Sequence, residues 1–238
     1  MHHRLEFRGS STCLFGDILI TMLLSLVTFG IYGPWGYVRL RKKMLQNTYL
    51  DDQPLDFDGT GGELFKIAIR AFFLTLITLG IHSLLCYPLV NVLKWDTEHQ
   101  VLPGGKRASY EGTALDLFGQ MIVVSLLSMV TLGIYSFWGY VRIRKHVCNQ
   151  TILDGIPWQF TGTAGGYFKV AIVTGLLSMI TFGIYVLVGA AVTKLYRWES
   201  ENTMVPLMAM PSAPQAPLSP TTSGDDDRPI QVNVTVNR

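Results

Sequence analysis

Apolar residues fall into four long runs along the chain, and short polar segments separate them. The runs cover residues 14–38, 64–93, 115–141 and 167–195. A helix needs about 20 predominantly apolar residues to cross a hydrocarbon core of about 30 Å, and each run exceeds that length. The pattern therefore predicts four membrane helices.

A five-residue motif, Thr-[Phe/Leu]-Gly-Ile-[Tyr/His], closes the helical part of every run. It occupies residues 28–32, 78–82, 131–135 and 181–185. The constant spacing, close to 50 residues, is typical of a repeated structural unit. The glycine is placed where a left-handed residue would end a helix.

A second motif precedes each run, an aromatic residue followed by x-Gly-[Ser/Thr], at residues 7–10, 57–60, 110–113 and 160–163. Its Ser or Thr is a good helix N-cap, because the hydroxyl can accept from a first-turn amide. Thr60 with Glu63, and Thr113 with Asp116, have the spacing of a capping box. A helix from Gly61 to Leu79 would have 19 residues and a length of about 28 Å.

These patterns predict an all-α integral membrane protein built from four repeated helical membrane units. The repeated membrane domain covers residues 4–203, with units at about 4–50, 51–101, 102–153 and 154–203. Segments 47–57 and 150–160 carry turn residues between β-formers and predict small extramembrane β-hairpins. Residues 204–238 are rich in Pro and Ser and predict a disordered C-terminal tail.

Odd and even units differ after the glycine, which gives a larger repeat of 103 residues. Units one and three continue with a basic, aromatic, amphipathic stretch, whereas units two and four stay apolar. Basic amphipathic helices suit an anionic headgroup surface. The predicted lipid-headgroup residues are Arg39, Arg41, Lys42, Arg142, Arg144 and Lys145.

Among the polar residues inside the apolar runs, four are candidate functional residues: Asp17, Gln120, Arg70 and His82. A polar or ionisable group within a membrane segment is by default a functional candidate. Asp17 also fits a hydrated carboxylate near a helix N-terminus. His82 replaces the Tyr of the other three motifs and also fits a hydrogen-bonded structural residue.

Composition excludes several classes of protein. Charged residues are 15% of the chain, against about 25% in a typical soluble protein. The net charge of +2 and the absence of a basic stripe interleaved with aromatics argue against a nucleic-acid partner. The three cysteines have neither disulfide nor zinc spacing. We recognise no nucleophile with a base, no metal-ligand cluster and no paired catalytic carboxylates, so we predict no enzyme and no cofactor.

The two motifs, together with the stretch 35–42, Asn47-Thr48 and residues 59–65, resemble the YjgN-like family, domain of unknown function 898. The resemblance covers roughly residues 7–203. It implies a multi-pass protein of the bacterial inner (cytoplasmic) membrane and no particular activity.

Two functions compete for this chain. Internal repeats favour a transporter or channel-like component, since many transporter folds contain them. The basic stretches favour a structural or membrane-organising protein that binds the lipid bilayer. A homo-oligomer is left open.

The number of crossings decides between two topologies. If every unit crosses once, the same motif must work on alternating faces; if every unit enters and returns, all four lie on one face. We predict four single spans, with both termini outside from a weak excess of positive charge in loops 39–66 and 142–169.

Overall fold

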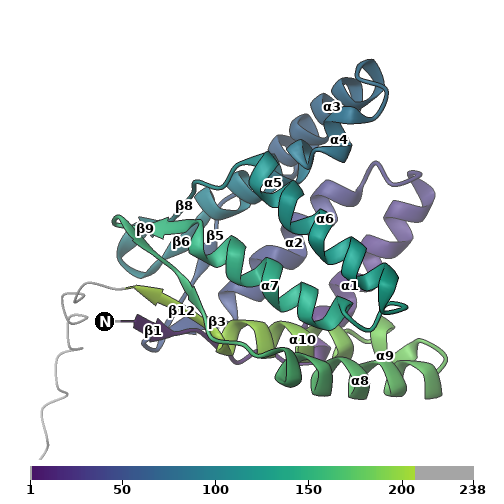
Figure 1. Cartoon of the computed structure of the whole chain (residues 1–238). Helices are drawn as coiled ribbons and strands as arrows, with labels where there is room; N and C mark the ends of the chain where they lie inside the picture. The colour runs from purple at the N-terminus through teal and green to yellow at the C-terminus, as the bar shows by residue number, and fades with distance from the viewer. Residues whose placement is uncertain (1, 207–238) are drawn as a thin grey trace, which may run out of the picture. The chain divides into compact units, whose positions relative to one another are not determined.

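A computed structural model describes residues 2–206 of the 238-residue chain, and four helical hairpins dominate it (Figure 1). In each hairpin an incoming strand leads into an outer helix, the chain turns at the Thr-x-Gly motif, and an inner helix returns to an outgoing strand.

The elements of the hairpins are as follows. The first hairpin comprises β2 (Glu6–Phe7), α1 (Ser11–Val27), α2 (Gly33–Gln46) and β3 (Thr48–Leu50). The second comprises β5 (Asp56–Phe57), α3 (Gly61–Ile77), α4 (Ile81–Leu84), α5 (Tyr87–Glu98) and β6 (Gln100–Leu102). The last two comprise β8 (Ser109–Tyr110), α6 (Ala114–Val130), α7 (Ser136–Asn149) and β9 (Thr151–Leu153), then β11 (Gln159–Phe160), α8 (Ala164–Ile180), α9 (Ile184–Leu187), α10 (Ala190–Glu201) and β12 (Thr203–Pro206).

The predicted N-caps explain where three outer helices begin. Thr60 accepts from the Glu63 amide while the Glu63 carboxylate accepts from the Thr60 amide, which is a complete capping box. Thr113 and Thr163 accept from the amide three residues on in the same way. Ser10 makes no such bond, because its hydroxyl pairs with Thr12 instead.

Four three-stranded antiparallel sheets tie the open ends of the hairpins together. Each incoming strand pairs with the outgoing strand of the same hairpin, as β2 does with β3 and β11 with β12. The third strand of the first three sheets belongs to the segment that leads to the next hairpin: β4 (Gln53–Pro54), β7 (Lys106–Arg107) and β10 (Ile156–Pro157). β7 follows a short 3₁₀ turn, η1 (Pro103–Gly105). The fourth sheet takes its third strand, β1 (His2–Arg4), from the start of the chain.

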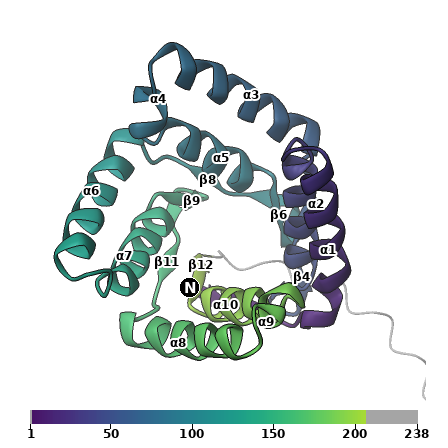
Figure 2. The ribbon, with the colours of Figure 1, turned by 90° about the vertical axis from the view of Figure 1, so that its right-hand side faces the viewer.

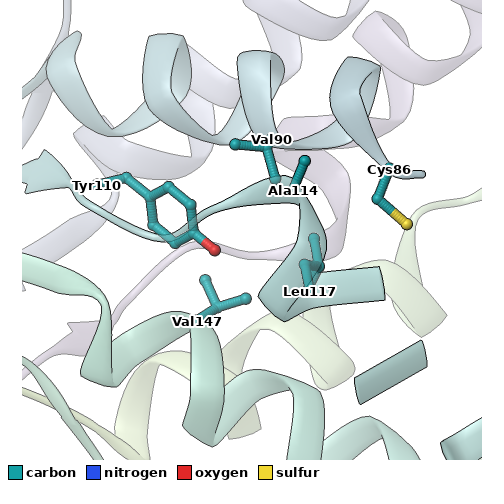
Figure 3. Packing of buried hydrophobic residues seen from close by; sticks show 6 residues of the cluster. All are labelled: Cys86, Val90, Tyr110, Ala114, Leu117 and Val147. Carbon is teal, nitrogen blue, oxygen red and sulfur yellow. The ribbon is translucent and has the colours of Figure 1, made fainter. Parts of the chain in front are cut away.

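The hairpins follow one another around a ring that the fourth closes against the first (Figure 2). The inner helix of each hairpin packs on the outer helix of the next: α2 on α3, α5 on α6, α7 on α8 and α10 on α1. Figure 3 shows one such junction, where Val90 of α5, Ala114 and Leu117 of α6, and Val147 of α7 pack around Tyr110. Buried apolar residues concentrate at the strand end, so the core lies there and not along the hairpins.

The prediction of an all-α protein with four single membrane crossings is wrong. Each apolar run is divided between two helices, because the Thr-x-Gly motif reverses the chain in the middle of the run. The outer helices have 17 residues, not 19, since they end one residue before the Thr. Within residues 2–206, no helix is both long enough and apolar enough to cross a membrane.

The predicted β-hairpins form at the expected turns, Asp51-Asp52 and Asp154-Gly155, but as parts of the larger sheets. The structure also differs at the predicted start of the tail. Residues 204–206 belong to β12, which pairs with β1 and β11 because apolar Val205 is buried beneath that sheet. The rest of the predicted tail, residues 207–238, lies outside the described residues.

Candidate functional site

The tips of the four hairpins are built by the Thr-x-Gly-Ile motif. In the first tip the Thr28 hydroxyl donates to the Leu24 carbonyl at 2.7 Å and accepts from the Tyr32 amide at 3.0 Å. It therefore caps the end of α1 and the start of the returning helix together. The equivalent threonines, Thr78, Thr131 and Thr181, make the same two contacts.

The backbone amides of the tip are satisfied within the tip itself. The Gly30 amide donates to the Ser25 carbonyl at 2.7 Å, and the amides of Thr28, Phe29, Ile31 and Gly33 also find carbonyl partners. The third tip repeats this set of bonds. A backbone that enters hydrocarbon must satisfy its polar groups internally, and the amides named in these two turns meet that condition.

Each tip exposes a large apolar side chain, and the backbone of that residue is left-handed. Phe29, Leu79, Leu132 and Phe182 are 97%, 93%, 94% and 96% exposed. Their φ angles are 50°, 51°, 51° and 49°, and the following glycine is left-handed too. A left-handed bulky residue costs about 1–2 kcal/mol. The same strained, outward-pointing residue at four tips indicates a function for the exposed apolar groups.

The part of each hairpin nearest its tip is free of Asp, Glu, Lys and Arg. The uncharged segments are 18–38, 71–93, 117–141 and 170–193. The flanking charges on the outer helices are Asp17, Arg70, Asp116 and Lys169, which precede the tip threonine by 11, 8, 15 and 12 residues. At 1.5 Å per residue these charges lie about 12–22 Å from the tips.

A buried ion pair links α2 to α5 inside the ring. Arg41 donates to Asp96 through Nε (2.9 Å) and its second terminal nitrogen (2.6 Å), and Tyr37 and Gln100 each donate to the same carboxylate at 2.9 Å. The side chains of Arg41 and Asp96 are only 20% and 10% exposed. Although Tyr37 is 39% exposed overall, its hydroxyl lies against Asp96, and loss of water there raises the pKa of the phenol, which stays a donor.

A second ion pair links α7 to α10 at positions 103 residues further along. Arg144 pairs with Glu199, and Tyr140 donates to the other oxygen of that carboxylate. The side chains of Arg144 and Glu199 are 27% and 22% exposed. Both pairs line one cavity of about 230 Å³ between the inner helices, which Trp158 and Cys148 also line. Arg41 and Arg144 were predicted to contact lipid headgroups at the surface, but both line this interior cavity.

The other predicted residues of hairpins one and three lie outside this cavity. Asp17 accepts from Lys43 of the neighbouring α2 at 2.6 Å and lies 4.0 Å from Arg39. Gln120 accepts from Arg142 at 2.8 Å. Lys42 and Lys145 are exposed on the inner helices.

Arg70 and His82 come together in a groove of about 540 Å³ on the second hairpin. The His82 ring stacks on Tyr87 with centroids 5.3 Å apart, and its Nε2 is buried without a partner among the described residues. Arg70 is exposed on α3 and faces the groove from the other side. None of the residues that line this groove also lines the central cavity. Asp17, Gln120, Arg70 and His82 therefore form no common polar path.

Sequence reasoning missed the two carboxylates of the interior, Asp96 and Glu199. Each follows the apolar return segment of an even unit, and they are separated by the same 103 residues as Arg41 and Arg144. That shared spacing was the available signal. It could have paired an acid of each even unit with the basic residue of the unit before it.

Comparison with known proteins gives the following matches. A family model described as a bacterial protein of unknown function, domain of unknown function 898, matches residues 2–65 and 106–158. A protein of Salmonella typhimurium named inner membrane protein YjgN is 34% identical over 80 residues, 34% of this chain and 20% of that protein. Its namesake from Escherichia coli O157:H7 is 26% identical over 81 residues, 33% of this chain and 20% of that protein.

No solved structure matches this chain. The matched segments span about a fifth of the length of the two relatives. The family model covers the whole of the first and third hairpins, from the incoming strand to the outgoing strand, together with the short strands that follow them. Together, the family model and the two relatives identify this chain as a member of the YjgN-like family of bacterial proteins of unknown function.

Proposed function

We propose that this chain is a membrane-organising protein that inserts its four hairpin tips into one face of the bacterial inner membrane. The observation that supports it best is the set of four nearly fully exposed apolar side chains at Phe29, Leu79, Leu132 and Phe182. Exposed apolar surface of this extent marks a membrane or protein contact. The names of the two relatives favour the inner membrane as its location.

The depth of insertion follows from the position of the charges. One leaflet contributes about half of a 30 Å hydrocarbon core, or about 15 Å. The charges that flank the uncharged segments begin about 12–22 Å from the tips, at 1.5 Å per residue. Tips that reach the middle of the bilayer would therefore place Asp17, Arg70 and Lys169 at the level of the headgroups.

Four tips give a firm attachment. Burial of one Phe or Leu side chain contributes about 1.5–3 kcal/mol, so the four tip residues contribute on the order of 6–12 kcal/mol before the surrounding helices are counted. The left-handed backbone of the tips is the same before and after insertion, so its cost of about 1–2 kcal/mol per tip belongs to folding and does not oppose insertion. Insertion is therefore favourable by several kcal/mol.

Transport is less well supported by the arrangement of polar groups. Asp17 and Gln120 are bound by basic residues of the adjacent helix, while Arg70 and His82 lie in a separate groove. A flux assay in vesicles with Asp17→Asn and Arg70→Ala tests this alternative. Flux that falls in either variant would favour transport over the organising role.

Topology is tested by single-cysteine labelling with a membrane-impermeant reagent, after replacement of Cys13, Cys86 and Cys148. Asp52 and Gly104 both lie in turns at the strand end, so we expect labelling at both sites from the same face. Labelling from opposite faces would contradict insertion from one side.

The tips are tested by Phe29→Asp combined with Phe182→Asp, with the strand substitution Ser109→Asp as the control. Each of the two tip substitutions loses about 1.5–3 kcal/mol of transfer free energy from the apolar side chain. Each also adds a carboxylate that costs about 2.5–3.5 kcal/mol in hydrocarbon. We expect the tip variant to shift into the soluble fraction on membrane flotation while the control stays bound. A tip variant that floats like the control would contradict the proposal.

A further inference from the structure

The second and fourth hairpins carry matching basic grooves between their outer and inner helices. The groove of about 540 Å³ on the second hairpin is lined by Arg70 of α3 and by Lys94 and Trp95 of α5. The groove of about 380 Å³ on the fourth is lined by Lys169 of α8 and by Lys194, Arg197 and Trp198 of α10. Each groove also contains one acid, Glu98 or Glu201.

The cations of these grooves lack carboxylate partners among residues 2–206. Arg70, Lys94, Lys169 and Lys194 take part in no ion pair there, and Lys194 lies instead over the Tyr185 ring at 5.4 Å. Arg197 donates to the Gly9 carbonyl at 2.9 Å. At the corresponding level of the first hairpin, Asp17 neutralises Lys43. The grooves therefore keep an excess of positive charge.

Each groove continues into apolar surface toward the tip. Above Arg70, apolar Ala71 and Leu74 of the outer helix α3 line the groove on its tip side, and α3 also exposes Phe73, at 55%. Above Lys169, the outer helix α8 exposes Val173 and Leu176, at 49% and 55%. A cationic site with an apolar wall on its membrane side is complementary to a lipid with a negatively charged headgroup.

We propose that each of these two grooves binds one anionic phospholipid. The phosphate lies between the cations of the outer and inner helices, and the acyl chains lie along the exposed face of α3 or α8. This inference rests on the proposed insertion, which places both grooves at headgroup depth. It moves the headgroup contact from the basic stretches of hairpins one and three to the second and fourth hairpins.

The test is native mass spectrometry of the full chain in detergent supplied with phosphatidylglycerol or phosphatidylcholine. We expect two phosphatidylglycerol molecules on the unaltered protein. The pair Arg70→Gln and Lys94→Gln removes one of them, and the pair Lys169→Gln and Lys194→Gln removes the other, each with at least a tenfold loss of affinity. All four residues are exposed, and thermal unfolding of each variant checks that it still folds.

The matched control is Lys42→Gln with Lys145→Gln, which removes two exposed cations outside the grooves. We expect this control to retain both lipids. Loss of lipid in the control but not in the groove variants, or equal retention of phosphatidylcholine, would overturn the inference.

Lipid retention is measured in detergent, so it does not depend on how the protein sits in a bilayer. A tip variant that leaves the membrane but keeps its lipids separates the grooves from the tips. Opposite-face labelling of Asp52 and Gly104 would refute one-sided insertion and leave the lipid count readable.

Discussion

Removal of the Asp96 carboxylate will destabilise the protein much more than removal of a surface carboxylate that also pairs with an arginine. In Asp96→Ala the Arg41 side chain, which is only 20% exposed in the unaltered protein, loses both of its carboxylate bonds, and Tyr37 and Gln100 lose an acceptor. An unpaired buried charge costs about 3–5 kcal/mol. Because the pair borders a cavity that water can enter, we expect the lower end, about 3 kcal/mol.

The matched control is Asp58→Ala, which removes the partner of exposed Arg107. That carboxylate also accepts two bonds from one guanidinium, but the two side chains are 49% and 42% exposed. Exposed pairs contribute about 0–1 kcal/mol. Both variants remove a carboxylate that pairs with one guanidinium through two bonds, but Asp96 is buried and also accepts from Tyr37 and Gln100.

Thermal unfolding in detergent measures the difference. For a chain of this size 1 kcal/mol corresponds to about 2–4 °C, so Asp96→Ala should lower the Tm by about 6–12 °C and Asp58→Ala by less than about 4 °C. The double variant Arg41→Met, Asp96→Leu removes both charges and should recover most of the loss, since an apolar replacement of a buried pair is often neutral. Equal losses for Asp96→Ala and Asp58→Ala, or no recovery in the double variant, would refute the assignment of a buried pair.

Two further predictions concern packing and pH. Gly36→Ala should lower the free energy of unfolding by about 1–3 kcal/mol, because a Cβ there would lie 2.1 Å from the Thr21 methyl group. The control Gly16→Ala, where a Cβ would meet no atom within 4 Å, should be neutral or stabilising. A denaturation series of both variants measures the difference. The Thr60 amide bond lowers the pKa of the Glu63 carboxyl, so its stabilisation is present above the ordinary pKa of 4.5 and disappears as the pH falls through the lowered value. The stability difference between the unaltered protein and Glu63→Gln, measured from pH 7 to pH 3, should close over that acidic range; a difference that is constant with pH would contradict the capping role.

Local structure was largely predictable from this sequence. The cap positions at Thr60, Thr113 and Thr163, the turn at Asp154-Gly155 and the left-handed glycines of the closing motif all follow from side chains acting on nearby backbone. Such interactions span only a few residues, so spacing alone reveals them.

The reversal of the chain was harder to predict. The uncharged segments have the length of a single membrane crossing, and hydropathy does not distinguish one straight helix from two helices folded together. The decisive feature is the left-handed Phe or Leu before each motif glycine, an uncommon conformation for a bulky residue. Propensity argues against that conformation, so the sequence pattern favoured a helix that simply ends at the glycine.

The interior ion pairs could not be placed from helix periodicity alone. Arg41 and Lys42 are neighbours in a basic stretch, yet one faces the cavity and the other solvent. Which of them points inward depends on α5, the helix of another hairpin, because Asp96 supplies the partner. Contacts between hairpins could not be predicted from the sequence of each unit taken separately.

Strand β1 makes the protein indivisible. The first three sheets are completed by the segment that follows each hairpin, but the fourth borrows a strand synthesised some 200 residues earlier. A fragment that stops after two or three hairpins leaves β1 with an unpaired edge, and exposed edges invite strand exchange and aggregation. Shortened versions of this protein should consequently associate with copies of themselves, and only a chain that reaches β12 can satisfy its own first strand.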